Sequence, residues 1–180
     1  MIYVFLANGF EEIEALAPVD ILRRAKADVK TVGVTGKEVT SSRGVIVKTD
    51  ITADEITLDD DLEMIVLPGG MPGTLNLEAS DKVQSAVDFC WQNDRYIAAI
   101  CAAPSILGHK GLLKGKTATS FPKFNGDLEG ANVVDELVAV DGKFITAKGA
   151  GASIEFGLTL AQLIVSRETS DSIKASMQCR

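Results

Sequence analysis

The chain has 180 residues, of which 46% are hydrophobic and 24% are charged, and this length predicts one domain over 1–180 with a substantial core. Its 18 basic and 25 acidic residues give a net charge of −7 without a cluster of Lys or Arg, which argues against a nucleic-acid partner. Because its longest apolar run is about half a membrane span and its start lacks the cationic segment of a signal peptide, we expect a cytoplasmic protein that binds no membrane.

Short apolar segments alternate with longer segments of helical periodicity from the first residues onward. Residues 2–7 form a continuous apolar run, as expected of a strand buried on both faces of a sheet. Apolar residues then recur at helical spacing over 11–25, and a second strand is predicted at 29–34. A Val- and Thr-rich segment over 42–49 and 51–52 is expected to form a hairpin-like excursion.

The second half of the chain continues this alternation. Strands are predicted at 64–67, 97–100, 117–120, 137–140 and 144–147. Helices are predicted at 81–92, 103–113 and 152–166, followed by a polar helical tail. Strands that alternate with helices of about 10–15 residues indicate βαβ units, so we expect a three-layer αβα sandwich around a mostly parallel sheet.

Cys101 directly follows the strand predicted at 97–100, among small residues. A strand that turns sharply into a helix through small residues is typical of a nucleophile elbow. The start of the next helix, where Pro104 suits the first turn, is expected to lower the pKa of the thiol. Alternatively, a cysteine among Ala and Ile simply packs in the core. The position alone leaves both interpretations open.

Glu14 is the most suggestive carboxylate of the chain. Pro18, four residues later, has no N–H to give to the Glu14 carbonyl, so we expect the helix to break or kink there. An acid left in such an apolar stretch would be buried, protonated near neutral pH and able to donate a hydrogen bond to a thiolate. Alternatively, Glu14 is a solvated residue of the first helical turn that complements the helix dipole, as Glu11 and Glu12 are expected to be.

Glycine-rich segments and the remaining chemistry-bearing residues carry weaker signals. Gly69 and Gly70 follow a predicted strand and form either a plain tight turn or a cradle of amides for an anion, and the two interpretations are compatible. Neither 149–154 nor 111–117 completes a nucleotide-binding motif. His109 lies ~12 Å beyond Cys101 along one helix, which is too far for a thiol–base pair.

The other two cysteines are given no chemical role. Cys90 is expected in the core beside Trp91, and Cys179 lies in the polar tail without a partner. Three scattered cysteines and one His predict neither a disulfide framework nor a metal site.

Taken together, these segments resemble the DJ-1/PfpI family, and within it the DJ-1-like branch. The matching segments keep the family's order over nearly the whole chain: 9–14, 18–20, 23–25, 42–43, 66–70, 98–104, 149–151 and 155–156. The cysteine segment and the Glu-Glu-x-Glu segment are specific in combination, whereas neither would be alone.

The resemblance implies a flavodoxin-like fold, a homodimer and no cofactor. It also implies that Cys101 is an oxidation-prone nucleophile, that Glu14 is its protonated partner, and that the amides of Gly69, Gly70 and Ala102 surround the thiolate or a bound oxyanion. Family activities are those of cofactor-free glyoxalases, deglycases of early glycation adducts, and oxidative-stress sensors or chaperones. The residues fit the first: Cys101 adds to a small aldehyde or ketoaldehyde, Glu14 moves a proton, and hydrolysis releases a hydroxy acid.

Four positions qualify this expectation. Ala102 stands where protease-like members carry His, which disfavours a thiol peptidase. Phe121 stands where many DJ-1-like members carry His, and the loss of that base favours redox sensing over efficient glyoxalase turnover. Lys148 replaces a frequent Arg, so charge is kept and bidentate recognition is lost. Arg43 matches a family arginine near the dimer-related site.

Two further functions are therefore weighed against a carbonyl-converting enzyme. The first is a non-catalytic sensor or chaperone in which Cys101 is oxidised to a sulfinate held by Glu14 and backbone amides. The second is a flavodoxin-like small-molecule binder, against which a purified protein without a chromophore would count.

Overall fold

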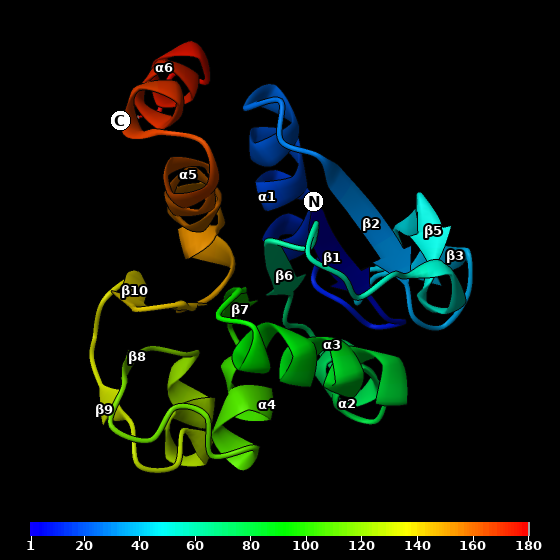
Figure 1. The fold of residues 1–180 in the computed structure, drawn as a ribbon, viewed down its shortest axis with the longest axis vertical. Coiled ribbons are helices and arrows are strands. Elements are labelled where there is room, and N and C mark those ends of the chain that lie inside the picture. Colours follow the sequence, from blue (N-terminus) through cyan, green and yellow to red (C-terminus); the bar gives the residue numbers. More distant parts are fainter. Residues whose placement is uncertain (180) are drawn as a thin grey trace.

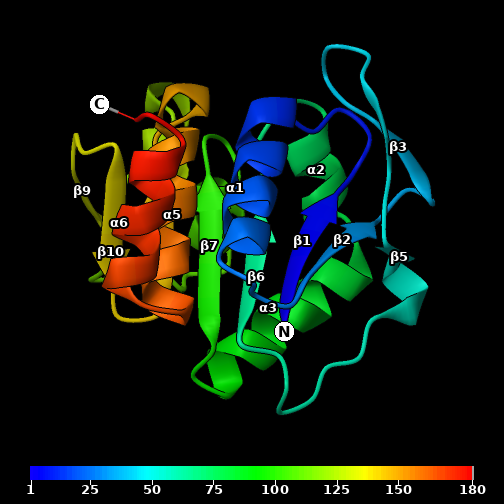
Figure 2. The ribbon, with the colours of Figure 1, turned by 90° about the horizontal axis from the view of Figure 1, so that it is seen from above.

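The computed structural model describes residues 1–179, and its centre is a seven-stranded sheet in the order β10-β11-β7-β6-β1-β2-β5. Neighbouring strands are parallel except β10 and β11, which are antiparallel. In that order the strands span Val138–Asp141, Phe144–Ala147, Tyr96–Ile100, Met64–Leu67, Ile2–Leu6, Val29–Gly33 and Ile51–Thr52. Figure 2 shows the sheet with helices in front of it and behind it.

Helices cover both faces of the sheet (Figure 1). One layer contains α1 (Glu12–Arg24), α5 (Ser153–Ile164) and α6 (Arg167–Ser176), and the other contains α2 (Gly73–Glu78), α3 (Asp81–Gln92) and α4 (Pro104–His109). Alternate side chains of β1 enter the two cores, since Val4 packs with the first layer and Phe5 with the second, both fully buried. The predicted three-layer, mostly parallel flavodoxin-like sandwich is confirmed.

Helix α1 runs without interruption across Pro18, so the predicted break there is wrong. The proline removes one helical N–H, but tertiary packing holds the segment in place. Gly157 of α5 allows the close approach, because a Cβ at this position would lie 3.1 Å from the Pro18 Cα and 2.7 Å from the Ile21 Cδ1. Packing between α1 and α5 therefore overrides the local helix-breaking signal.

The excursion predicted over 42–49 and 51–52 divides between two sheets. Strands β3 (Glu38–Thr40) and β4 (Ile46–Lys48) form a separate antiparallel hairpin, which starts earlier than expected. Ile51–Thr52 instead forms β5, which pairs in parallel with β2 at the edge of the main sheet.

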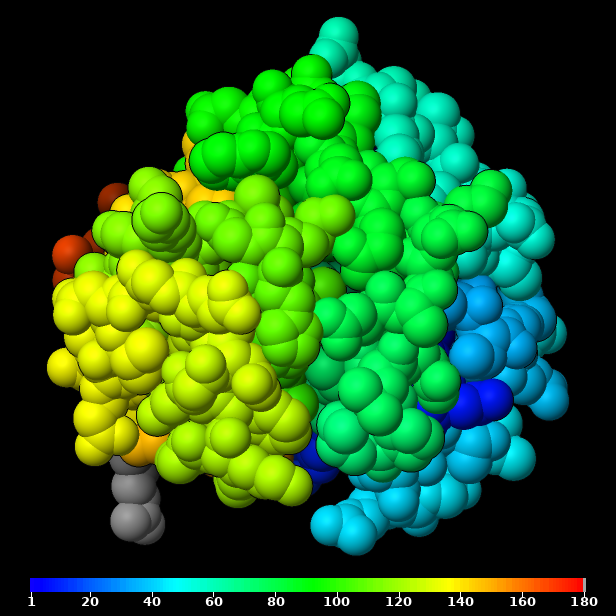
Figure 3. Space-filling view, turned by 90° about the horizontal axis from the view of Figure 1, so that it is seen from below, coloured from blue at the N-terminus to red at the C-terminus, as the bar shows by residue number. Residues whose placement is uncertain are grey.

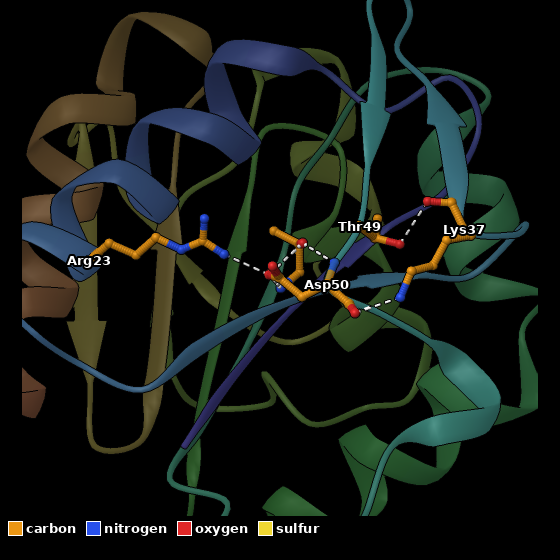
Figure 4. Close-up of polar contacts among 5 residues, drawn as sticks. Arg23, Lys37, Thr49 and Asp50 are labelled. Atoms are coloured by element: carbon orange, nitrogen blue, oxygen red, sulfur yellow. Dashed lines mark hydrogen bonds and ion pairs between the residues drawn. The ribbon is translucent and has the colours of Figure 1, made fainter.

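Asp50 fixes this edge of the sheet (Figure 4). Its carboxylate accepts hydrogen bonds from Arg23 (2.6 Å) and from the backbone N–H (2.7 Å) and hydroxyl (2.8 Å) of Thr31. Lys37 donates to the Asp50 carbonyl oxygen at 2.5 Å, and the Thr49 hydroxyl donates to the Lys37 carbonyl at 3.0 Å. Although burial favours the neutral acid, the hydrogen bonds from Thr31 and the charge of Arg23 outweigh it and lower the pKa of Asp50.

Other boundaries differ from the predictions. The helix predicted over 103–113 ends at His109, and Gly111 follows in the left-handed conformation (φ 70°). The strand predicted at 117–120 is shortened to β8 (Thr117–Ala118), which pairs with β9 (Asn132–Val133) outside the main sheet. Helix α2 was not predicted. Three 3₁₀ helices complete the fold: η1 (Ala53–Glu55), η2 (Pro122–Asp127) and η3 (Ala150–Ala152).

Figure 3 shows the face that is covered by the helices after β6 and by the β8–β9 segment. Among the helices of residues 1–179, none combines the length and the apolar character needed to cross a bilayer.

Candidate active site

Cys101 occupies the turn between β7 and α4, at the carboxyl end of the parallel strands. Its φ of 65° lies in the left-handed region, which residues with a side chain adopt only rarely. The Cys101 N–H donates to the Ala147 carbonyl at 2.8 Å, and the Cys101 carbonyl accepts from the Phe121 N–H at 2.9 Å. These two hydrogen bonds hold the strained residue from both sides, so its half-buried side chain projects from a fixed corner.

Glu14 is fully buried in the first turn of α1, so it is not the solvated first-turn acid that was the alternative expectation. The Gly69 N–H donates to the Glu14 Oε2 at 2.9 Å. A Cβ on Gly69 would lie 2.6 Å from this oxygen and 2.7 Å from the Cys101 Cβ. Gly69 therefore lies between the acid and the cysteine, where a larger residue would not fit.

Burial raises the pKa of Glu14 to about 7, which places its protonation equilibrium at neutral pH. The Cys101 side chain and the amides of Gly69 and Ala150 oppose this shift. The Glu14 Oε1 is buried and has no hydrogen bond of good geometry among residues 1–179. The Cys101 side chain nevertheless lies nearby, because one position, that of a Cβ on Gly69, lies 2.6 Å from the Glu14 Oε2 and 2.7 Å from the Cys101 Cβ.

Burial also raises the pKa of the Cys101 thiol, to about 12, and the negative charge of Glu14 raises it further. The amides of Ala102 and Gly70 act in the opposite direction. This is the opposite of the expected lowering of the thiol pKa by the helix start, because burial and the charge of Glu14 outweigh the amides of Ala102 and Gly70. When Glu14 keeps its proton, its repulsion disappears and its O–H can donate to the sulfur. The acid and the thiol therefore titrate as one coupled pair.

The three backbone amides expected around the sulfur have two different targets. Those of Gly70 and Ala102 interact with Cys101, whereas that of Gly69 binds the Glu14 carboxyl. Gly70 needs its glycine, because its φ is 90° and a Cβ would lie 2.4 Å from the Glu11 backbone nitrogen.

The loop after β11 adds residues that the sequence reasoning missed as site components. The Ala150 amide interacts with Glu14, and a Cβ on Gly149 would lie 4.0 Å from the Cys101 Sγ. The available signal is the run of small residues directly after the last strand, which does not complete a dinucleotide motif. Small residues serve here to let the loop approach the cysteine closely.

The other predicted pocket residues differ in position. The Phe121 ring lies 3.6 Å from the position of a Cβ on Gly149, so it borders the cysteine turn, and the residue is 47% exposed. Lys148 follows β11, and its Nζ makes an ion pair with Asp135. Arg43 is exposed in the turn of the β3–β4 hairpin, and no contact brings it to Cys101.

The remaining reactive side chains lie elsewhere. His109 contacts Glu78 (Nδ1 to Oε1, 2.6 Å). Cys90 is buried in the core as expected, and burial raises its pKa to about 12. Within residues 1–179, no group of three or more His, Cys, Asp or Glu side chains is arranged to hold a metal ion.

Comparisons with known proteins identify the family of this chain. The model of the DJ-1/PfpI family matches residues 1–163. The protein DJ-1 homolog A of Arabidopsis thaliana is 36% identical over 179 residues, which are 97% of this chain and 45% of that protein. The chain thus spans less than half the length of this relative.

Two further matches cover most of both proteins. The crystal structure of Drosophila melanogaster DJ-1beta superposes with a TM-score of 0.94 at 32% identity, and covers 99% of this chain and 97% of the other. A deglycase, TK1284 of Thermococcus kodakarensis, is 27% identical over 152 residues, which are 83% of this chain and 90% of that protein.

Proposed function

Because the chain belongs to the DJ-1/PfpI family, we propose that it converts small reactive carbonyl compounds without a cofactor, through Cys101 and Glu14. The activity is that of a glyoxalase, which turns a 2-oxoaldehyde such as methylglyoxal into a hydroxy acid, or that of a deglycase. The observation that carries the proposal is the fully buried Glu14, whose pKa of about 7 lets it both give and take a proton beside the cysteine. The similarity to a named deglycase supports the second of these activities.

The first step starts from the form of the pair in which the sulfur has lost its proton and Glu14 has kept its own, and the Cys101 thiolate adds to the aldehyde carbon. A C–S bond forms, the carbonyl π electrons move to the oxygen, and the protonated Glu14 gives its proton to that oxygen. The amides of Gly70 and Ala102, which interact with the sulfur, are available to stabilise the negative oxygen as it forms. The product of this step is a hemithioacetal beside an ionised Glu14.

The ionised Glu14 then removes the proton from the former aldehyde carbon and returns it to the neighbouring ketone carbon. The oxygen proton of the hemithioacetal is transferred to the ketone oxygen, which leaves a thioester of the hydroxy acid on Cys101. Water hydrolyses the thioester, releases the hydroxy acid and restores the thiol. One water molecule is consumed and no external oxidant is needed, because one carbon is oxidised while its neighbour is reduced.

Hydroxy-acid formation from methylglyoxal tests the proposal. Cys101→Ala and Glu14→Gln should each lose at least about a hundredfold in kcat, since both act in the chemical steps. Cys179→Ala and Glu129→Gln, which change a thiol and an exposed carboxylate outside the site, should keep the wild-type rate. Wild-type rates in either site variant would exclude the proposal.

An oxidation sensor is the second candidate, and the position of Phe121 favours it. The aromatic ring borders the cysteine where a second proton-transferring base would otherwise assist turnover. Two peroxide molecules would oxidise the thiolate to a sulfenate and then to a sulfinate and release water, and the Glu14 O–H and two amides would hold the sulfinate oxygens. A stable two-oxygen adduct on Cys101 after mild peroxide, without carbonyl turnover, would favour this function.

The proposal also includes a cytoplasmic location and a homodimer, which the family resemblance implies.

A further inference from the structure

An apolar hollow of about 510 Å³ lies directly beside the cysteine turn. Its lining combines the ring of Phe121, Pro122 and the side chain of Leu137 with the loop 148–152. Phe121 is 47% exposed and Leu137 is 48% exposed, so two large apolar side chains of this lining face solvent. Covering such surfaces with an apolar group is favourable.

Gly149 borders both the hollow and the reactive sulfur. This residue belongs to the lining, and the position of a Cβ on it lies 4.0 Å from the Cys101 Sγ and 3.6 Å from the Phe121 Cδ2. The hydrogen bond from the Phe121 N–H to the Cys101 carbonyl (2.9 Å) fixes the backbone of Phe121 relative to the cysteine turn. A substituent of a molecule bonded to the sulfur can therefore extend along Gly149 toward the hollow.

The lining of the hollow favours an apolar substituent over a polar one. Lys148 contributes a cation at the edge of the hollow, but its Nζ is paired with Asp135. Residues 149–152 are Gly and Ala, so the side chains of this loop are hydrogen atoms or methyl groups. An anionic substituent would compete with Asp135 for Lys148, whereas an apolar substituent meets a matching surface.

We propose that the substrate of Cys101 is a 2-oxoaldehyde with an aryl or branched alkyl substituent, and that Phe121 and Leu137 select it. This inference rests on the proposed carbonyl-converting function and names the class of its substrate. The substituent occupies the hollow while the aldehyde carbon is held at the sulfur. Glyoxal has no substituent to fill this space and is the poorer substrate.

Relative turnover tests the selection. In the wild type, kcat/KM for phenylglyoxal should exceed that for glyoxal at least about tenfold, which is the discrimination an apolar pocket provides. The rate of Cys101→Ala is subtracted to remove reaction outside the site. Phe121→Ala should bring the ratio close to one, and Leu137→Ala should lower it severalfold. Val165→Ala, which truncates an exposed valine at the far end of α5, should leave the ratio unchanged.

A second readout needs no turnover. The rates at which iodoacetamide and N-benzyl iodoacetamide alkylate Cys101 are compared in the same variants, and the benzyl reagent should react several times faster in a manner that depends on Phe121. Benzyl preference without turnover of any aldehyde would support the apolar hollow and contradict the proposed function. Turnover in which glyoxal matches phenylglyoxal, or an unchanged ratio in Phe121→Ala, would overturn the inference and leave the proposed function standing.

Discussion

Glu14 and Cys101 are two acids in a space that accommodates one negative charge. Burial raises the pKa of Glu14 to about 7 and that of Cys101 to about 12, and each negative charge opposes the other. A thiolate at neutral pH therefore requires that the proton remain on Glu14. The proton on Glu14 therefore has two roles: it removes the negative charge that would repel the thiolate, and it can be donated to the substrate oxygen.

The cost of holding Glu14 in this environment should appear in the stability of the protein. Its pKa is raised from 4.5 when unfolded to about 7 when folded, so its favourable contribution is complete below pH 4.5 and is lost as the pH rises through 7. Glu14→Gln cannot ionise. We therefore compare the free energy of unfolding of this variant with that of the wild type. The difference, variant minus wild type, should be on the order of 2–3 kcal/mol larger at pH 8 than at pH 4.5. Urea unfolding at the two pH values measures this gain, and a pH-independent difference would contradict the buried-acid assignment.

Gly69 is expected to be indispensable for the geometry of this pair. In Gly69→Ala, the new Cβ would lie 2.6 Å from the Glu14 Oε2 and 2.7 Å from the Cys101 Cβ, so both groups must move. A displacement of about 1 Å at reacting groups costs on the order of a hundredfold in rate. Kinetics with a 2-oxoaldehyde should show this loss, whereas Gly126→Ala, with open space around its Cβ, should not. Equal rates in both variants would show that the spacing does not matter.

The residue types of the site could be predicted, but not all of their partners. The apolar surroundings of Glu14 correctly indicated a buried acid. The Ala150 amide could not be found in this way, because a backbone N–H carries no signature in the side-chain sequence and its direction depends on how η3 packs against α1. The raised pKa of Cys101 was missed because burial depends on the whole fold and not on the strand end alone.

At the scale of elements, the contact between α1 and α5 determines where Glu14 lies. Gly157→Ala should destabilise the protein by about 1–2 kcal/mol, because overpacking against Pro18 and Ile21 exceeds the helix propensity gained. Ile21→Val removes the Cδ1 that would lie 2.7 Å from the new Cβ, so the double variant should recover part of that loss. Thermal unfolding of the wild type, the two single variants and the double variant measures the coupling between the two positions. Additive changes in stability would show that the two side chains do not contact each other.

The long, buried elements followed from their periodicity, whereas short elements at the edges did not. Strand β6 and helix α3 have the predicted bounds. The helix break at Pro18 and the extent of the β3–β4 hairpin were mispredicted, because tertiary contacts decide them: the close approach of Gly157 in the first case, and pairing of β5 with β2 in the second. Local sequence carries neither contact.

At the scale of the whole molecule, exposed aliphatic side chains are consistent with the proposed homodimer. Ile13 on α1 is 52% exposed, and Ile46 on the hairpin is 65% exposed. The hairpin is tied to the start of α1 by the hydrogen bond from the Ser42 N–H to the Phe10 carbonyl (2.7 Å). Light scattering at micromolar concentration should give twice the mass of one chain, and Ile46→Glu should lower it. A single-chain mass for the unaltered protein would contradict the dimer.

The pH dependence of Cys101 alkylation tests the coupled pair most directly. Wild type and Glu14→Gln are treated with iodoacetamide from about pH 5 to 10, and labelling of Cys101 is followed by peptide mass spectrometry. The wild-type rate should rise in a first step near pH 7, where the pair loses its first proton, and rise again toward the thiol value of about 12. Glu14→Gln should lose the step near pH 7 and titrate once, between these values. One identical titration in both proteins, at the value of an ordinary free thiol, would contradict the account.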